Sequence, residues 1–196
     1  MVTFKNTRTT AELAQILSLQ ARNLSQVLSS DEQTDQGFVT VQHDLPLLAT
    51  MAEQYGHVVA RDDHRVIGYA LVMLPEFKDR IAMLRPMFER LRELTYQGRP
   101  VPGYRYFVMG QVCIDAAYRG KGVFSGLYHQ LKASMSSAFD LVITEVATRN
   151  PRSLRAHRKV GFQTLETYVA DTGEAWNVLL WDLRDDTPDE SAPRLG

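Results

Sequence analysis

The chain has 196 residues, of which 44% are hydrophobic and 23% are charged, and its 22 basic side chains nearly balance 23 acidic ones. This length fits one domain, and the composition is ordinary for a globular protein. The formal net charge of −1 lacks the basic excess that favours nucleic acid or an anionic membrane surface, so we expect neither partner.

The cysteine and histidine content indicates an intracellular protein without a metal. The one cysteine, Cys113, excludes an intrachain disulfide and a zinc site built from paired cysteines, and the histidines lack metal-ligand spacing. The polar segment 1–10 has no apolar signal-peptide core, and no apolar run reaches the roughly 20 residues that span a bilayer. We therefore expect a soluble, cytoplasmic protein.

The first elements in chain order are a short strand and two helices. Residues 2–5 form the strand, and Thr9 or Thr10 can cap a helix whose apolar residues recur at helical spacing as far as Leu24. After a polar loop over residues 25–36, a shorter helix is expected around residues 45–55.

A hairpin and a helical insertion follow. The β-rich runs 57–61 and 66–74 flank a polar turn and predict a hairpin. Apolar residues at helical spacing over 77–94 predict a helix that breaks or kinks at Pro86, and a loop rich in Pro and Gly follows it. We treat residues 77–98 as an insertion in the domain.

The second half alternates buried strands with helices. Residues 104–114 carry apolar groups on both faces, with Phe107, Met109 and Cys113 on one of them, which is typical of a central strand. The remaining expected elements are a helix over 120–136, a strand over 141–147, a helix over 150–160, strands over 163–170 and 175–183, and a flexible tail over 185–196. This order predicts an α/β domain with a mixed sheet and helices on both faces.

A glycine-containing turn between a buried strand and a helix carries the chemical signal. Gly120 and Gly122 let the backbone approach a ligand, and the free N–H groups of the helix start favour a phosphate. Arg119 and Lys121 add positive charge. The spacing matches neither a P-loop nor the dinucleotide GxGxxG motif, because no Ser or Thr follows Lys121 and position 125 is Ser.

This turn resembles the signature of the GNAT superfamily of acyl-CoA-dependent N-acyltransferases, in which Arg or Gln precedes x-x-Gly-x-Gly/Ala. The segment here is Arg119-Gly120-Lys121-Gly122-Val123-Phe124, with Phe in place of the usual small residue. Asn150 opens a second helix that ends in Lys159-Val160-Gly161-Phe162, which resembles the family's Asn-x-x-Ala…Tyr-x-x-x-Gly-Phe helix.

The resemblance implies a fold, a co-substrate and its contacts. The fold is a mostly antiparallel sheet of six or seven strands with a splayed central pair, and acetyl-CoA lies in the splay. Backbone groups of the central strand pair with the pantetheine arm, and the turn grips the pyrophosphate. The residues assigned to acetyl-CoA are Val112, Cys113, Ile114, Arg119, Gly120, Lys121, Gly122, Val123, Phe124, Ser125, Asn150 and Ser153.

His157 stands where the family has the tyrosine that protonates the departing thiolate. It shares a helix face with Asn150 and Ser153, and an imidazole can donate a proton near neutral pH. We name it as a candidate catalytic acid. The alternative is that His157 only packs beside the co-substrate or solvates the helix.

Glu145 is the candidate base or amine anchor. It lies near the end of a buried strand whose other residues on that face are apolar, and a poorly solvated carboxylate can become basic enough to accept a proton. The alternative is an ion pair with Arg149 or Arg152. Gln111 could orient substrate or be a satisfied core amide, and Cys113 is expected to be a packed thiol.

We expect residues 1–184 to form one N-acetyltransferase domain that transfers an acetyl group directly to an amine on a small molecule or a protein. The sequence is compatible with a homodimer. The alternative function is a non-catalytic acyl-CoA-binding sensor or interaction module of the same fold, which the replacement of the tyrosine and the presence of Phe124 motivate.

Overall fold

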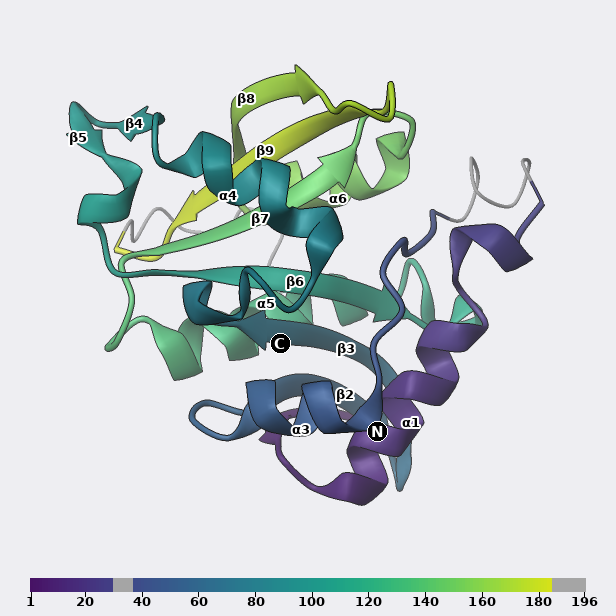
Figure 1. The fold of residues 1–196 in the computed structure, drawn as a ribbon. Helices are drawn as coiled ribbons and strands as arrows, with labels where there is room; N and C mark the ends of the chain where they lie inside the picture. Colours follow the sequence, from purple (N-terminus) through teal and green to yellow (C-terminus); the bar gives the residue numbers. More distant parts are fainter. Residues whose placement is uncertain (30–36, 185–196) are drawn as a thin grey trace.

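The computed structural model describes residues 1–29 and 37–184, and a seven-stranded sheet runs through it in the order β1-β2-β3-β6-β7-β9-β8 (Figure 1). Every neighbouring pair is antiparallel except β6 and β7, which are parallel. This arrangement confirms the predicted fold class. The strands are β1 (Val2–Thr7), β2 (His57–Asp62), β3 (Arg65–Met73), β6 (Tyr106–Ile114), β7 (Leu141–Ala147), β8 (Gln163–Val169) and β9 (Ala175–Asp182). The predicted tail over 185–196 lies outside the described residues.

Helices cover both faces of the sheet. Neighbouring residues along a strand point to opposite faces, and they pack in two different hydrophobic clusters. Val59 and Tyr69 pack with α1 (Thr10–Ala21), whereas Val58 and Ala70 belong to the large cluster that contains α5 (Val123–Met135). Figure 1 shows α4 in front of β7 and β9, with α5 behind the sheet. The remaining α-helices of the described chain are α3 (Leu45–Ala52), α4 (Arg85–Leu91) and α6 (Pro151–Lys159).

The helix starts follow local capping chemistry. The side chains of Thr9, Asp44 and Asn150 each accept a hydrogen bond from a backbone N–H in the first turn of the helix that follows. Pro46 lies in the first turn of α3, where its missing N–H costs no hydrogen bond. The capping side chains therefore fix where α1, α3 and α6 begin.

The insertion is divided into short segments, whereas the pattern predicts one helix that breaks or kinks at Pro86. Two 3₁₀ turns (Pro75–Phe77 and Ala82–Leu84) precede the short α4. Pro86 lies in the first turn of α4 rather than at a kink, because only there is its lack of an N–H harmless. The expected loop after the helix contains a small hairpin of β4 (Thr95–Tyr96) and β5 (Arg99–Pro100).

A β-bulge in β6 corrects the predicted faces of this strand. Leu71 pairs with Gln111 and Val72 pairs with Met109, so Gly110 is the extra residue. Phe107 stacks edge-on against Phe139, just beyond α5, whereas Cys113 packs in the cluster of α1. Cys113 is therefore on the opposite face from Phe107, although both have odd numbers.

The parallel contact between β6 and β7 is short. Pairing joins Tyr106–Val108 to Leu141–Ile143, while β6 continues to Ile114 and β7 to Ala147. The two strands therefore separate toward their carboxyl ends, as the predicted splayed pair requires. Among the described residues, one side-chain hydrogen bond joins the two strands where the gap begins. The hydroxyl of Thr144 donates it to the carbonyl of Met109 at 3.0 Å.

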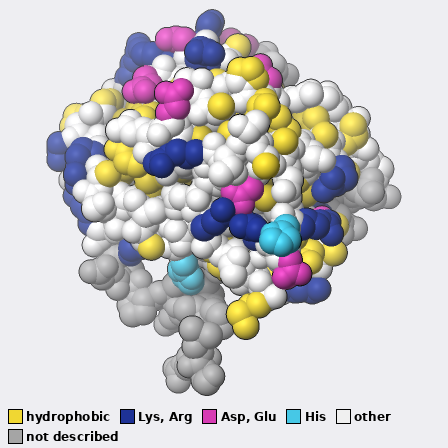
Figure 2. Space-filling view, turned by 90° about the horizontal axis from the view of Figure 1, so that it is seen from below, with side chains coloured by type: hydrophobic (Ala, Val, Ile, Leu, Met, Phe, Trp, Pro, Cys, Tyr) yellow, Lys and Arg dark blue, Asp and Glu magenta, His cyan; other side chains and the backbone are white. Residues whose placement is uncertain are grey.

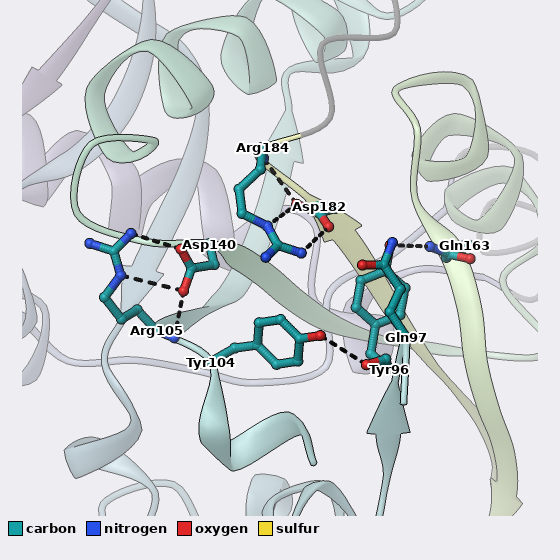
Figure 3. A network of polar contacts seen from close by, with 8 residues as sticks. All are labelled: Tyr96, Gln97, Tyr104, Arg105, Asp140, Gln163, Asp182 and Arg184. Carbon is teal, nitrogen blue, oxygen red and sulfur yellow. Dashed lines mark hydrogen bonds and ion pairs between the residues drawn. The ribbon is translucent and has the colours of Figure 1, made fainter. Parts of the chain in front are cut away.

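A polar network fastens the closed end of this splay (Figure 3). Arg105, just before β6, donates to both carboxylate oxygens of Asp140, just before β7, with Nη2–Oδ1 at 2.7 Å and backbone N–Oδ2 at 3.0 Å. Arg184 pairs with Asp182 at the end of β9, and its guanidinium lies 5.2 Å from the ring centroid of Tyr104. These contacts join the ends of three strands at one place.

The surface carries charges of both signs (Figure 2), and the helices are short. On the face in Figure 2, Lys and Arg side chains lie near Asp and Glu, with hydrophobic side chains scattered between them. Across residues 1–29 and 37–184, every helix is too short or too polar to cross a bilayer.

We predict that Asp140→Ala lowers the free energy of unfolding by no more than about 1 kcal/mol, because the side chain of Arg105 is 60% exposed and water partly replaces its lost partner. Urea denaturation measures this change. The pKa of Asp140 is lowered, mainly by the Arg105 hydrogen bonds, so its contribution is present above the ordinary carboxyl pKa and is lost as the pH falls through the lowered value. Asp171→Ala, in the exposed β8–β9 turn, is the control, and an equal loss in both variants would contradict the role of the network.

Candidate active site

A cleft of about 450 Å³ opens where β6 and β7 separate. Its walls are the end of β6, the turn that follows, residues 37–39 and one face of α6 along its length. Every residue predicted to contact acetyl-CoA lines this cleft except Lys121. The ammonium group of Lys121 instead lies 5.6 Å from the ring centroid of Tyr118.

The turn before α5 has the shape of an anion cradle. Gly120 and Gly122 have φ angles of +76° and +77°, which L side chains rarely adopt. A Cβ added at either position would meet no protein atom within 4 Å, so the space beside them is open. The first backbone N–H to enter the helical pattern is that of Gly126, which donates to the carbonyl of Gly122. The amides of 123–125 are therefore available to an anion.

Arg119 forms hydrogen bonds to two segments at the edge of the cleft. Its Nε donates to the carbonyl of Ile114 at 3.0 Å, and its Nη2 donates to Oδ1 of Asn23 at 2.5 Å. The guanidinium thus joins the end of β6 to the residue just beyond α1. Its positive charge still borders the cleft.

Sequence reasoning missed a row of basic side chains on α6. Arg152, Arg155 and Lys159 line the cleft. Their positions lie on one helix face, three and four residues apart, so the periodicity of the basic residues was the available signal. Together with the turn, they make the cleft wall strongly cationic.

A strap over residues 37–40 was also missed. The backbone of Val39 pairs with that of Asn23 and Ser25, and the carbonyl of Phe38 accepts from Nδ2 of Asn150 at 3.4 Å. The Arg149 guanidinium lies 4.4 Å from the ring centroid of Phe38. The strap therefore crosses from the end of α1 to the start of α6. Its sequence has no periodic pattern that could have revealed this.

Asn150 and Ser153 have structural contacts inside the cleft. Oδ1 of Asn150 accepts from the backbone N–H of Ser153 at 3.1 Å and caps α6, while the amide nitrogen holds the strap. The backbone carbonyl of Ser153 lies 2.8 Å from Nδ1 of His157.

A second, smaller cavity of about 70 Å³ lies between β6 and β7. Glu145, Gln111 and His157 all border it, so the structure brings together the polar residues that the sequence singled out. They come from opposite sides. Glu145 lies on the face of the sheet that α4 covers, because it is hydrogen-bonded to Tyr168, whose ring packs under Arg90 of α4. His157 belongs to α6.

Glu145 has the properties of a base. Burial raises the pKa of its carboxyl to about 7, and a hydrogen bond that Oε1 accepts from the hydroxyl of Tyr168 opposes this rise. Arg149, one of the ion-pair partners considered for Glu145, pairs with Glu174 at 2.7 Å. A carboxyl with a pKa near 7 is well matched to proton transfer at neutral pH.

His157 is buried and neutral. Desolvation lowers the pKa of its imidazole to about 4. Nδ1–H donates to the carbonyl of Ser153, so Nε2 accepts from the hydroxyl of Tyr128 at 2.7 Å. The ring also lies edge-on to Phe124 and Phe162, each with centroids 5.1 Å away. This setting lacks the protonated imidazole that a catalytic acid needs at neutral pH.

Gln111 and Cys113 are engaged in the core. Oε1 of Gln111 accepts from Gln20 at 2.8 Å and from Tyr69 at 2.5 Å, and its Nε2 donates to the carbonyl of Val41. The satisfied-amide alternative therefore describes Gln111. Burial raises the pKa of the Cys113 thiol to about 12, which keeps it protonated and poorly nucleophilic.

The arrangement can bind an elongated, phosphate-bearing molecule from one side and present a basic carboxylate from the other. The cationic cleft adjoins the small cavity that Glu145 borders, since Val112, Asn150 and Ser153 line both. Within residues 1–29 and 37–184, no three His, Cys, Asp or Glu side chains gather as a metal-ligand set.

Comparison with solved structures finds the same fold in several acetyltransferases. The ribosomal-protein-S18-alanine N-acetyltransferase from Escherichia coli matches with a TM-score of 0.61 at 12% identity, over 93% of this chain and 94% of the other. A GNAT-family acetyltransferase from Streptococcus agalactiae matches at 0.63 and 16%, over 92% and 95%. The Salmonella typhimurium protein yncA, solved with its cofactor acetyl-CoA, matches at 0.60 and 14%, over 97% and 99%.

None of the curated protein sequences matches this chain significantly. The model of the acetyltransferase (GNAT) family, however, matches residues 13–162, which include the turn, the splayed strands and α6. The described elements and the sequence motif therefore agree: the chain belongs to the acetyltransferase (GNAT) family.

Proposed function

We propose that this protein transfers the acetyl group of acetyl-CoA directly to a primary amine, with Glu145 as the base. The observation that carries the proposal is the junction of two cavities in the splay. A cationic cleft of about 450 Å³ shares part of its lining with a cavity of about 70 Å³, and Glu145, a carboxyl with a pKa of about 7, borders this cavity.

The cleft fits the co-substrate. The open space beside Gly120 and Gly122 and the free amides of 123–125 suit a pyrophosphate. Arg152, Arg155 and Lys159 supply further charge for phosphate groups. Beyond Val108, the edge of β6 that faces β7 lacks a strand partner in the described chain, so its backbone groups near Val112 and Ile114 can pair with the amides of the pantetheine arm.

Glu145 does the proton chemistry from the α4 side. When bound, acetyl-CoA supplies a thioester whose acyl carbon accepts the amine nitrogen and whose sulfur leaves as a thiolate. Glu145 takes the proton that the attacking amine must lose, directly or through a water molecule. The carboxylate also attracts the ammonium form of the acceptor into the small cavity.

His157 supports the site rather than donating a proton. Its two ring nitrogens join the backbone of α6 to Tyr128 on α5, the helix whose start forms the cradle. A thiol is an acidic leaving group (that of cysteine has a pKa of about 8.5), so a thiolate is a weak enough base to leave without a dedicated acid. This assignment revises the catalytic role that the resemblance implies for His157.

We predict that Gly122→Ala raises the Kd for acetyl-CoA at least about tenfold, because the new methyl group occupies the cradle. Isothermal titration measures the Kd. Gly173→Ala is a matched control, since Gly173 also has a positive φ (+81°) and open space around it but lies in the β8–β9 turn. Both variants should lose about 1 kcal/mol of stability through backbone strain. Equal effects on the Kd would contradict the assigned cradle.

We predict that Glu145→Gln lowers kcat/KM about 10²–10⁴-fold on any accepted amine and removes the rise in rate with pH near 7. Release of free thiol over an amine panel measures the rate. Because the folded state raises this pKa above 4.5, the wild-type chain loses stability as the pH rises through about 7, and the variant should not.

Glu53→Gln, on the exposed side of the molecule, is the control for Glu145→Gln. Tight acetyl-CoA binding without turnover on any amine would instead favour the acyl-CoA-binding module.

We predict that His157→Phe retains most of kcat but lowers the free energy of unfolding by about 1–3 kcal/mol, because the hydroxyl of Tyr128 loses its acceptor. Wild-type stability should fall as the pH drops from 6.5 toward 4, since the unfolded state takes up the proton first, and the variant should fall less steeply. Urea denaturation at several pH values checks this. A loss of kcat by 10²-fold or more would restore His157 as the acid.

A further inference from the structure

Tyr168 reaches Glu145 across a strand. Tyr168 lies on β8 and Glu145 on β7, with β9 between them. The ladders place Tyr168 opposite Trp176 and Trp176 opposite Ala147, so the tyrosine shares the face of the sheet that carries Glu145. Its hydroxyl donates a short hydrogen bond to Oε1 of Glu145.

Tyr168 is fixed unusually well for a residue on an edge strand. It is 7% exposed and is the one residue of β8 that counts as buried. The guanidinium of Arg90, on α4 of the insertion, lies 4.5 Å from the centroid of its ring. Nη1 of Arg90 also pairs with Oε1 of Glu166 on β8 at 2.8 Å. The insertion therefore holds the tyrosine from outside the sheet.

This contact leaves one oxygen of Glu145 for chemistry. Oε1 is occupied by Tyr168, and no side chain or backbone group of the described chain is hydrogen-bonded to Oε2. A carboxylate held through one oxygen has a fixed orientation, and the donor stabilises its ionised form. The other ionisable groups around it are Glu166 on β8, Arg90 on α4 and His157 across the small cavity.

We propose that Tyr168 is a positioning residue for Glu145, and that Arg90 of the inserted helix holds Tyr168 in this role. The inference rests on the proposed function, in which Glu145 is the base. It gives the insertion a purpose in catalysis, because the insertion supplies the guanidinium that packs on the tyrosine ring.

The test is the pH profile of Tyr168→Phe, which keeps the ring under Arg90 and removes only the hydroxyl. Loss of the hydrogen bond should move the acidic limb of kcat/KM upward by about one pH unit, so that the rate falls about tenfold below the limb and recovers above it. Tyr55→Phe, whose hydroxyl contacts the exposed Gln54, is the control and should leave the limb in place. An unmoved limb in Tyr168→Phe would overturn the proposal.

A direct titration separates this inference from the proposed function. The carboxyl carbon of Glu145, observed by ¹³C NMR in Glu-labelled protein, should titrate about one unit higher in Tyr168→Phe than in the wild-type chain. Glu145→Gln identifies the signal. If no amine is acetylated, the proposed function fails, and the titration alone decides whether Tyr168 acts on Glu145. An unchanged titration would overturn the inference even in an active enzyme.

Arg90 is tested by a double-mutant cycle. Arg90→Met should move the same limb upward by less than Tyr168→Phe does, because the ring loses its brace but keeps its hydroxyl. In the Tyr168→Phe background the change should have no further effect on the limb. An equal shift in both backgrounds would show that Arg90 acts on Glu145 without Tyr168, and it would overturn this half of the proposal.

Discussion

The separation of β6 from β7 is the constraint on which the rest of the structure depends. Two parallel strands that pair over three residues each and then diverge leave unpaired backbone groups inside the protein. That state is stable only if the closed end is held and the open end is filled or lined by polar groups. The Arg105–Asp140 network holds the closed end, and Thr144, Glu145 and the strap border the open one.

Burial acts in opposite directions on the two ionisable residues between the strands. It removes the charge from His157, whose pKa falls to about 4, and makes Glu145 a stronger base, whose pKa rises to about 7. On the α6 side the surroundings of His157 are aromatic, since Phe124, Tyr128 and Phe162 all pack around its imidazole. The two departures from the family motif, Phe124 and His157, are thus one packing unit.

The sequence predicted what is local and missed what is assembled from distant segments. Strand and helix positions followed from periodicity and capping, and the cradle followed from the glycines before α5. The face of Cys113 was mispredicted because a one-residue bulge at Gly110 is invisible to alternation. The charge state of His157 depends on rings from three other positions, and the Tyr168–Glu145 contact spans two strands. Neither leaves a mark in sequence spacing.

Asn150 links the two segments that border the cleft, the strap and α6, and so affects how a ligand enters and leaves. One side chain caps α6 through its oxygen and holds the carbonyl of Phe38 through its nitrogen. Arg149 beside it stacks on Phe38 and pairs with Glu174 in the β8–β9 turn. Lifting the strap therefore exposes the capping residue, and fraying of the first turn of α6 releases the strap. These shared contacts couple the strap to the first turn of α6, so we expect a molecule that fills the cleft to slow amide hydrogen exchange in both segments.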